Sequence, residues 1–460
     1  MALLDLYMQT GGDDRNAGTD NGSNPTEILG TVSTASGLTT FTASSGTPFA
    51  SGVSAGSWVS LYNSSESISR FSGQVQSVTS STVIVIYNQA ATSPNNTALG
   101  TVASLTGSVA CRVGGAWSSL AITGTNGVMN SPSTSAALVG NQYNGLRVNI
   151  KASTYTFTSS ITLPVGLAAK PIWWRGYYAT PGDIDNCANV SGSLVAPTGQ
   201  TAAPSGATRP IISSSVSSGS NIVLNAYNWL ENIEFTFTTS TNGGGLATAT
   251  QNGYVRLVRC RFGGSGVNAN IVQITYNTSV NAIGCCFDCT SGYCNVLYGG
   301  ANFTAYGCTF RGSAAYGFTM QGNSCALAYN LFTGSGNLVY INGGSGLLNF
   351  INNTFYGSSS GTGNAISIAA AVNYRIDGIN NIFHKCSNAI SGISNLTIPW
   401  SCQLINNDFA TVTTMPSLFE AYQRGVQYET TPFTNASSND FSLTSTSVAR
   451  QAGFPGQFEV

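Results

Sequence analysis

The stretch Asn330-Leu331-Phe332, followed by Asn353-Thr354-Phe355 and Asn381-Ile382-Phe383, decides the fold of this chain. A Phe recurs with Asn two residues before it, and upstream copies carry Cys in place of Asn. Successive Phe residues are 27, 25, 23, 22, 23, 28 and 26 positions apart, so the period is near 25. Such a fixed period indicates a repeat architecture. The repeated positions are Phe235, Phe262, Phe287, Phe310, Phe332, Phe355, Phe383 and Phe409, together with Cys260, Cys285, Cys308, Asn330, Asn353, Asn381 and Asn407.

Each repeat contains short alternating stretches, such as Asn364-Ala365-Ile366-Ser367-Ile368, and these predict strands. Gly, Asn and Ser separate them, as turns require. No segment carries a 3.6-residue amphipathic period. A repeat of about 25 residues with two or three short strands predicts one coil of a parallel β-helix. Neighbouring coils stack about 4.8 Å apart, and this stacking buries the apolar faces.

The repeated residues have a physical role in such a coil. Side chains alternate along a strand, so the Phe and the residue two positions before it face the same way. We expect the Phe rings to stack inside the helix, with Cys acting as a small hydrophobic residue. An inward Asn can bond its neighbours up the stack. The column therefore predicts a Cys ladder followed by an Asn ladder.

The charge content excludes several classes of function. The 460 residues carry 16 Lys+Arg and 17 Asp+Glu, so 7% are charged, against about 25% in an ordinary soluble domain. This leaves no basic surface for nucleic acid. The one His, His384, cannot build a multi-His metal site, and we expect no metal or cofactor. No window of about 20 residues stays apolar, so we expect no membrane insertion.

The N-terminal part differs from the repeats. Residues 73–78 and 82–87 alternate like strands of a small antiparallel β domain. We expect this domain to span residues 1–104, the β-helix to span 105–430, and a closing segment to span 431–460. The first residues lack a basic leader, and Asp5 interrupts their short apolar run. We therefore expect synthesis in a host cytoplasm without a signal peptide.

Several segments resemble a known superfamily. Ile161-Thr162-Leu163-Pro164, the strand ending in Arg175-Gly176-Tyr177, and the closing Thr431-Pro432-Phe433 resemble the right-handed parallel β-helix, or pectate-lyase-like, superfamily. The resemblance covers roughly residues 105–460. It implies an all-β fold, a right-handed parallel β-helix with a small N-terminal antiparallel β domain. Many activities share this fold, so the resemblance says little about function.

The resemblance implies that an enzyme on this fold would attack polysaccharides. A hydrolase needs converging carboxylates, and a lyase needs acidic calcium ligands with an Arg or Lys base. Asp183 and Asp185 point the same way if extended, and Arg375 and Asp377 share a face. These four are the candidates for catalysis. The competing interpretations are a turn loop for the first pair and an in-strand ion pair for the second.

Other motifs have structural interpretations beside functional ones. Opposite charges align on adjacent coils, as in Glu234 and Arg261 or Asp288 and Arg311, and this favours structural pairs over catalysis. His384-Lys385 is expected at a surface turn, with a base for sugar chemistry as the alternative. Trp173-Trp174 and Tyr177-Tyr178 are either a sugar-stacking platform or core residues. The group Cys285, Cys286, Cys289 and Cys294 matches no zinc pattern well, so buried thiols are expected.

Two classes of function remain, with a third beside them. The β-helix, the separate N-terminal domain and the sparse charge resemble bacteriophage virion proteins, namely a capsid decoration protein, a head fibre or a tail spike. That resemblance implies a non-enzymatic homotrimer in the virion. The N-terminal domain would contact other virion proteins, and host surface polysaccharide is a candidate ligand. The alternative is a polysaccharide lyase or glycoside hydrolase acting as a depolymerase. A glycan-binding module without catalysis is the third hypothesis.

Overall fold

The computed structural model describes most of the chain. The described residues are 3–22, 24–88, 98–103, 105–123, 129, 143–185, 187, 190, 203–216, 220–238, 244–248, 253–265, 270–274, 278–289, 302–312, 316–320, 324–357, 363–369, 372–396, 402–414, 422–425, 427–438 and 440–449.

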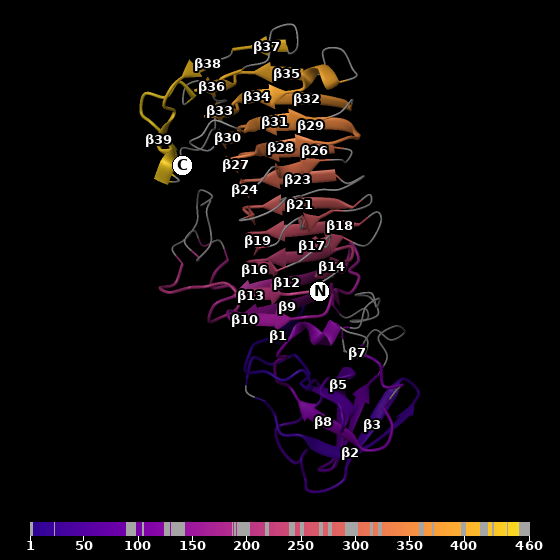
Figure 1. Ribbon diagram of the computed structural model, residues 1–460. Coiled ribbons are helices and arrows are strands. Elements are labelled where there is room, and N and C mark those ends of the chain that lie inside the picture. The colour runs from indigo at the N-terminus through magenta and orange to yellow at the C-terminus, as the bar shows by residue number, and fades with distance from the viewer. Residues whose placement is uncertain are drawn as a thin grey trace.

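The larger part of the molecule is a stack of parallel strands whose two main sheets run its length (Figure 1). The 12-stranded sheet comprises, in spatial order, β1 (Leu4–Met8), β9 (Leu146–Lys151), β12 (Ile172–Tyr177), β15 (Asn228–Glu231), β18 (Tyr254–Val258), β21 (Ser279–Ile283), β23 (Asn302–Tyr306), β26 (Ser324–Ala328), β29 (Ser345–Ile351), β32 (Asn373–Ile379), β35 (Cys402–Ile405) and β37 (Tyr422–Arg424). The 11-stranded sheet comprises β10 (Thr154–Phe157), β13 (Ile211–Ser214), β16 (Glu234–Thr238), β19 (Arg261–Ser265), β22 (Cys286–Cys289), β24 (Thr309–Gly312), β27 (Leu331–Gly334), β30 (Thr354–Gly357), β33 (Ile382–His384), β36 (Asp408–Ala410) and β38 (Gln427–Glu429).

A third side of the stack is formed by two shorter parallel sheets. One contains β11 (Ile161–Thr162), β14 (Ile222–Leu224), β17 (Gly244–Thr248) and β20 (Asn270–Gln273), and the other contains β25 (Tyr316–Met320), β28 (Asn337–Ile341), β31 (Asn364–Ile368) and β34 (Asn388–Ser391). Short 3-10 turns are η1 (Leu120–Thr123), η2 (Ile393–Asn395) and η3 (Ala436–Ser438). Consecutive coils therefore contribute neighbouring strands to each sheet. The prediction of an all-β parallel β-helix with a small N-terminal antiparallel domain is confirmed.

The interior is held by the column of repeated Phe residues. Phe235 pairs in register with Phe262, and each later Phe pairs with the next up to Phe409. The rings stack nearly parallel, with centroid separations between 4.7 and 5.3 Å. All eight are at most 3% exposed. The spacing matches the distance between strands, so the backbone repeat itself brings the rings into contact.

The residues two positions before the Phe form a polar ladder in the later coils. Asn330, Asn353 and Asn381 each donate from Nδ2 to the Oδ1 of the next Asn, at 3.0, 3.1 and 3.0 Å, and Asn407 ends the series. The same Oδ1 atoms accept the preceding ladder residue's backbone N–H, and each Nδ2 also donates to a carbonyl. The buried amides are thereby satisfied, which removes the cost of burying them. Cys260, Cys285 and Cys308 continue this column and are buried free thiols.

The residue just before each ladder position turns the corner in the left-handed region. Asn352, Asn380 and Asn406 have φ between 53° and 55° there, and Gly284 and Gly307 hold the equivalent places in earlier coils. Asn and Gly tolerate this conformation best, which explains the Asn-Asn pairs in the sequence.

A small barrel lies at one end of the stack (Figure 1). Its antiparallel strands are, in spatial order, β4 (Trp58–Asn63), β8 (Val109–Val113), β2 (Ile28–Ala35), β3 (Leu38–Ala43), β6 (Val83–Tyr87), β5 (Phe71–Ser80) and β7 (Ala98–Gly100). A further pairing of β4 with β5 closes it. The barrel has its own core, with Phe41, Phe71 and Ile84 fully buried. Closure removes the free edges that an open sheet would present.

The strand pairing does not follow the domain boundary expected at residue 104: one strand before it belongs to the β-helix, and one strand after it belongs to the barrel. β1 pairs in parallel with β9 and is the first strand of the β-helix sheet, although it precedes the barrel in sequence. Its Leu4, Leu6 and Met8 alternate inward and join the helix core. β8 pairs with β2 and β4 inside the barrel. The chain therefore starts in the helix, builds the barrel over 28–113, and returns.

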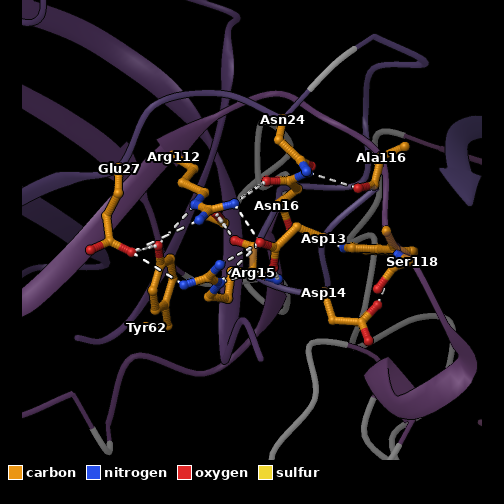
Figure 2. Close-up of polar contacts among 12 residues, drawn as sticks. Asp13, Asp14, Arg15, Asn16, Asn24, Glu27, Tyr62, Arg112, Ala116 and Ser118 are labelled. Atoms are coloured by element: carbon orange, nitrogen blue, oxygen red, sulfur yellow. Dashed lines mark hydrogen bonds and ion pairs between the residues drawn. The ribbon is translucent and has the colours of Figure 1, made fainter. Parts of the chain in front are cut away.

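A buried polar cluster joins the barrel to the segment that follows β1 (Figure 2). Arg112 of β8 donates to Asp13 at 2.9 Å, to Asn16 at 3.1 Å and to the Tyr62 hydroxyl at 3.0 Å. Tyr62 in turn donates to Glu27 at 2.5 Å. Burial alone would raise the pKa of Asp13, but the hydrogen bonds from Arg15 and the charge of Arg112 lower it to about 2. The cluster thus ties strands of the barrel to the lead-in loop.

Candidate functional site

The outer face of the 12-stranded sheet carries a charged and aromatic column near the barrel end. Asp5, Arg147, Trp173, Trp229 and Arg256 occupy the same outward position on five consecutive strands, β1, β9, β12, β15 and β18. Side chains at one register position of a parallel sheet are about 4.8 Å apart, so these five form one continuous surface. Asp5 and Arg147 pair at 2.6 Å at one end of it.

Two half-buried indoles lie at the centre of this column. The rings of Trp173 and Trp229 meet edge to face, with centroids 6.0 Å apart and planes at 68°. The guanidinium of Arg147 lies 5.6 Å from the Trp173 ring, and that of Arg256 lies 5.7 Å from the Trp229 ring. Cations over indole faces are attracted by the ring quadrupole, so these contacts hold the Arg side chains beside the aromatic rings.

The neighbouring column supplies a polar network. Arg175 pairs with Asp185, whose Oδ1 also accepts from Asn232 at 2.7 Å. The Asn232 amide oxygen accepts from Arg259 at 2.9 Å, and Arg259 pairs with Glu231. Two carboxylates are therefore linked through one amide and balanced by two guanidinium groups. Charge-assisted bonds of this kind fix the geometry of the site.

Glu231 is the most perturbed carboxyl of this group. Its side chain is 10% exposed, and burial raises its pKa above the ordinary value. The charge of Arg259 opposes that rise, the charge of Asp185 adds to it, and the Trp173 indole donates a hydrogen bond to the carboxylate. A carboxyl whose pKa is raised in a cleft is a candidate proton donor.

These side chains enclose a cleft of about 260 Å³. This volume lies slightly below the range of about 300 to 1,000 Å³ of sites for drug-sized ligands, so the cleft suits a short segment of a ligand. We call it the Trp–Arg cleft. Its walls are formed by Trp173, Asp185, Trp229, Leu230, Glu231, Arg256, Val258 and Arg259.

The structure separates the two aspartates expected to act together. Asp183 accepts backbone N–H bonds from Tyr178, Ala179 and Thr180, at 2.9, 2.6 and 2.9 Å, and so shapes the loop after β12. Asp185 pairs with Arg175 and lines the Trp–Arg cleft. Asp183 is therefore used in its own turn, and Asp185 converges with Glu231 instead.

The second candidate pair lies far along the same sheet. Arg375 donates to Asp377 at 3.0 Å within β32, and the Arg side chain is 55% exposed. This is an ion pair along one strand, and β32 lies five strands beyond β18, the nearest strand of the cleft, in the sheet order. On the next sheet Arg261 bonds both Glu234, at 3.2 Å, and Asp288, at 2.9 Å. Such contacts join adjacent coils.

The remaining motifs divide between core and surface. Trp174 is 1% exposed and donates to Asn228 at 2.8 Å, while its neighbour Trp173 faces outward. Tyr177 is buried. His384 is 5% exposed, so the expected surface turn is wrong for this residue, because the C-terminal segment covers it. Cys285 and Cys286 are buried thiols whose pKa is raised by burial; the Cys294 expectation lies outside the described residues.

Sequence reasoning missed Trp229, Glu231 and Arg256. A signal for the first two was present, because Asn228-Trp229-Leu230-Glu231 aligns with Ile172-Trp173-Trp174-Arg175. The two stretches are 56 positions apart, about twice the ordinary period, since one coil contains a long inserted loop. A period near 25 predicts a further coil between Trp173 and Trp229, so the sequence did not show that their strands are neighbours.

Two kinds of site are absent from the part of the chain that the structure describes. No group of three or more His, Cys, Asp and Glu side chains there is placed to hold a metal ion. None of its helices has the length and apolar character needed to cross a membrane.

Comparison with known proteins assigns this chain to no family. No family model matches the chain, and no curated protein matches it. Among solved structures, pectate lyase Pel9A is 13% identical and aligns over 66% of this chain and 82% of its own, with a TM-score of 0.35. The catalytic domain of a GH87 α-1,3-glucanase in complex with nigerose is 11% identical over 91% of this chain and 99% of its own, with a TM-score of 0.19. A likeness this weak establishes neither a family nor a function. The description of the chain as a parallel β-helix rests on its own strand pairing.

Proposed function

We propose that this protein is a non-enzymatic structural protein of a bacteriophage particle, a β-helical shaft that binds host surface glycan at the Trp–Arg cleft. The observation that carries the glycan part is the outward pair Trp173 and Trp229, flanked by Arg147 and Arg256. The C–H face of a sugar ring is apolar and packs on an indole, while its hydroxyl groups bond to guanidinium and carboxylate groups. The cleft offers both kinds of contact side by side.

The engagement of the carboxylates supports a binding role over catalysis. Asp185, Glu231 and Asp377 are each paired with an Arg, and Asp183 is bonded to three backbone amides. A general acid or nucleophile must be free to exchange a proton or attack the substrate. Carboxylates held in ion pairs position hydroxyl groups well and react poorly.

The particle part of the proposal rests on the architecture. A continuous Phe stack and Asn ladder make a stiff shaft, and the barrel at one end is a separate unit with its own core. We propose that the barrel contacts other virion proteins and that the shaft assembles as a homotrimer, in a decoration protein, head fibre or tail spike. Light scattering of the purified chain tests the assembly. A trimer is expected, and a stable monomer at micromolar concentration contradicts this part.

Glycan binding is tested separately. The purified protein is applied to an array of bacterial surface polysaccharides, and each positive glycan is then titrated by calorimetry. Binding of at least one glycan is expected, without release of reducing sugar or unsaturated product on long incubation. Absence of binding across the array contradicts the assignment of the cleft.

The second candidate is a polysaccharide lyase or glycoside hydrolase, favoured by one observation. Glu231 is buried beside the cleft with a raised pKa, as a general acid requires, and Asp185 lies on the same wall. A screen for reducing ends and unsaturated products over the same glycans decides between the two. Activity that is lost in Glu231→Gln and kept in Asp183→Asn supports the enzyme, because only the first residue lines the cleft.

A further inference from the structure

The C-terminal segment forms a strap over the outer face of the 11-stranded sheet. Strands β39 (Phe433–Asn435) and β40 (Asp440–Leu443) pair as an antiparallel hairpin. The segment turns back along the stack from its far end, beside β30 and β33 (Figure 1). Phe433 packs on His384 at 5.6 Å, and Phe441 packs on Tyr356 at 5.2 Å. Residues 431–449 are called the strap below.

The aromatic contacts make the strap a cover for apolar surface. Tyr356 and His384 stack at 5.5 Å on adjacent strands of the sheet, and both are at most 8% exposed. Phe433 and Phe441 contact each other at 5.4 Å above them. Lys385 lies 5.7 Å from the Tyr356 ring at the side of the cluster. Removal of the strap would therefore expose two aromatic rings to water.

An acidic pair lies where the strap leaves the last coil. Asp408 on β36 is 2% exposed, and no N–H or hydroxyl donor among the described residues meets either of its carboxyl oxygens. Glu429 lies on the paired strand β38, and its Oε1 accepts from Ser447 of the strap at 2.7 Å. Burial, followed by the hydrogen bond to Glu429 and the charge of that carboxylate, raises the pKa of Asp408 to about 8. A buried carboxyl without a donor is stable only when it is protonated.

We propose that the strap is a pH-dependent latch, closed while Asp408 keeps a proton beside Glu429 and loosened when that proton is lost. In the closed state the pair shares one proton and one negative charge. Loss of the proton leaves two carboxylates side by side, the buried Asp408 and the partly exposed Glu429, whose carboxylate accepts from Ser447. Opening hydrates both carboxylates, so the open state is the one that releases the proton.

The sign of the pH dependence follows from this difference. The pKa of Asp408 in the closed state exceeds the ordinary value near 3.9 that it regains on opening. The closed state is therefore favoured at acid pH and loses that stability as pH rises toward about 8, above which the loss is complete. The other charged groups that act on this cluster are Lys385 and Glu429, which both affect His384. Burial, followed by the charge of Lys385, lowers the pKa of His384, so its effect on the strap is opposite in sign to that of Asp408 and grows only toward the acid end of that window.

Hydrogen exchange of the full chain tests the latch. Protection factors, corrected for intrinsic exchange, are measured between pH 6.5 and 9.5 for amides of β39 and β40, with amides of β31 as the internal reference. We expect strap protection to fall by up to about tenfold per pH unit up to about pH 8 and then to level off, because opening releases one proton. The reference amides should keep their protection throughout.

Three variants complete the experiment. In Asp408→Asn, which imitates the neutral carboxyl, strap protection should no longer vary with pH. In Glu429→Gln the fall should move to lower pH, because burial still raises the pKa of Asp408 but the neighbouring charge is gone. Asp377→Asn, which alters a carboxylate on another sheet, should behave as wild type.

Two results overturn the proposal. One is strap protection in wild type that is constant from pH 6.5 to 8.5. The other is a fall in Asp408→Asn that equals that of wild type. If Asp408→Asn loses protection in the reference amides as well, the variant is destabilised as a whole and Glu429→Gln is used instead. In that variant the loss of strap protection must occur at lower pH than in wild type, and an unchanged pH dependence overturns the proposal.

Discussion

The indole of Trp173 lies edge to face with the indole of Trp229, 6.0 Å away, although 56 positions separate them in sequence. They meet because β12 and β15 are adjacent strands of one parallel sheet. The loop between them carries Asp185 back to the same place, where it pairs with Arg175. The segment from Trp173 to Trp229 therefore contributes both the aromatic surface and the Asp185 carboxylate to the Trp–Arg cleft.

Replacement of Trp229 should abolish most glycan affinity. Trp229→Ala removes half of the aromatic surface and the support for Arg256. A central aromatic anchor contributes about 2 kcal/mol or more to binding, so we expect the Kd to rise by about 30-fold. Calorimetry with a glycan that binds wild type measures this. Tyr306→Ala, an exposed ring of the same sheet three coils away, is the control and should bind as wild type. Equal affinity of Trp229→Ala and wild type would place the glycan elsewhere.

The Asn ladder should be essential for stability. Asn353→Ala removes the acceptor of two Asn330 donors and the donor to Leu327, all in the interior. Each buried group left unpaired costs about 1 to 3 kcal/mol, so we expect a loss of at least about 2 kcal/mol in the free energy of unfolding. Asn349→Ala changes an outward residue of the neighbouring strand and should cost less than about 0.5 kcal/mol. Denaturant unfolding of both variants compares them.

The junction cluster should couple the barrel to the helix. Arg112→Met leaves Asp13 without one of its two guanidinium partners and takes a donor from Asn16. Because the Arg112 side chain is only 8% exposed, we expect a loss of about 3 kcal/mol or more and a barrel that melts before the helix. Arg70→Met breaks a more exposed pair with Glu66 and should cost at most about 1 kcal/mol. A single calorimetric transition with unchanged Tm in Arg112→Met would show that the cluster contributes nothing.

The one His of the chain should oppose the pH dependence that Asp408 gives the strap, because its own contribution to stability is lost at acid pH. Burial, followed by the charge of Lys385, lowers the pKa of His384 below its ordinary value of 6.5. The folded state therefore binds fewer protons there, and stability present above pH 6.5 is lost as pH falls through the folded pKa. We expect the advantage of wild type over His384→Gln to shrink between pH 7.5 and 5, measured as the difference in Tm. A constant difference would mean that His384 does not titrate in the native state.

Much of the fold could be predicted because the interior repeats. Phe332 and Phe355 each stack on a Phe in the coil above and in the coil below. Every coil therefore needs a Phe at the same position, and this need appears in the sequence as a period. The left-handed corner adds a second requirement that Asn352 and Gly307 meet with their own backbone freedom. Composition alone also excluded a basic surface. Both requirements concern a few residues within one coil, so each produces a pattern that can be read from a short stretch of sequence.

The Trp–Arg cleft and the acidic pair beside the strap could not be predicted from short stretches of sequence. Trp173 and Glu231 meet across an insertion whose length no pattern predicts. The pKa of Asp408 is raised because burial and Glu429, on the paired strand, disfavour its charged form. β1 joins the helix although the whole barrel lies between it and its partner β9. The sequence by itself determined a coil of about 25 residues with a stacked Phe and Asn interior, since every coil repeats the same contacts. Only the tertiary structure decided which outward residues share a surface, because that depends on strand register across loops of unequal length.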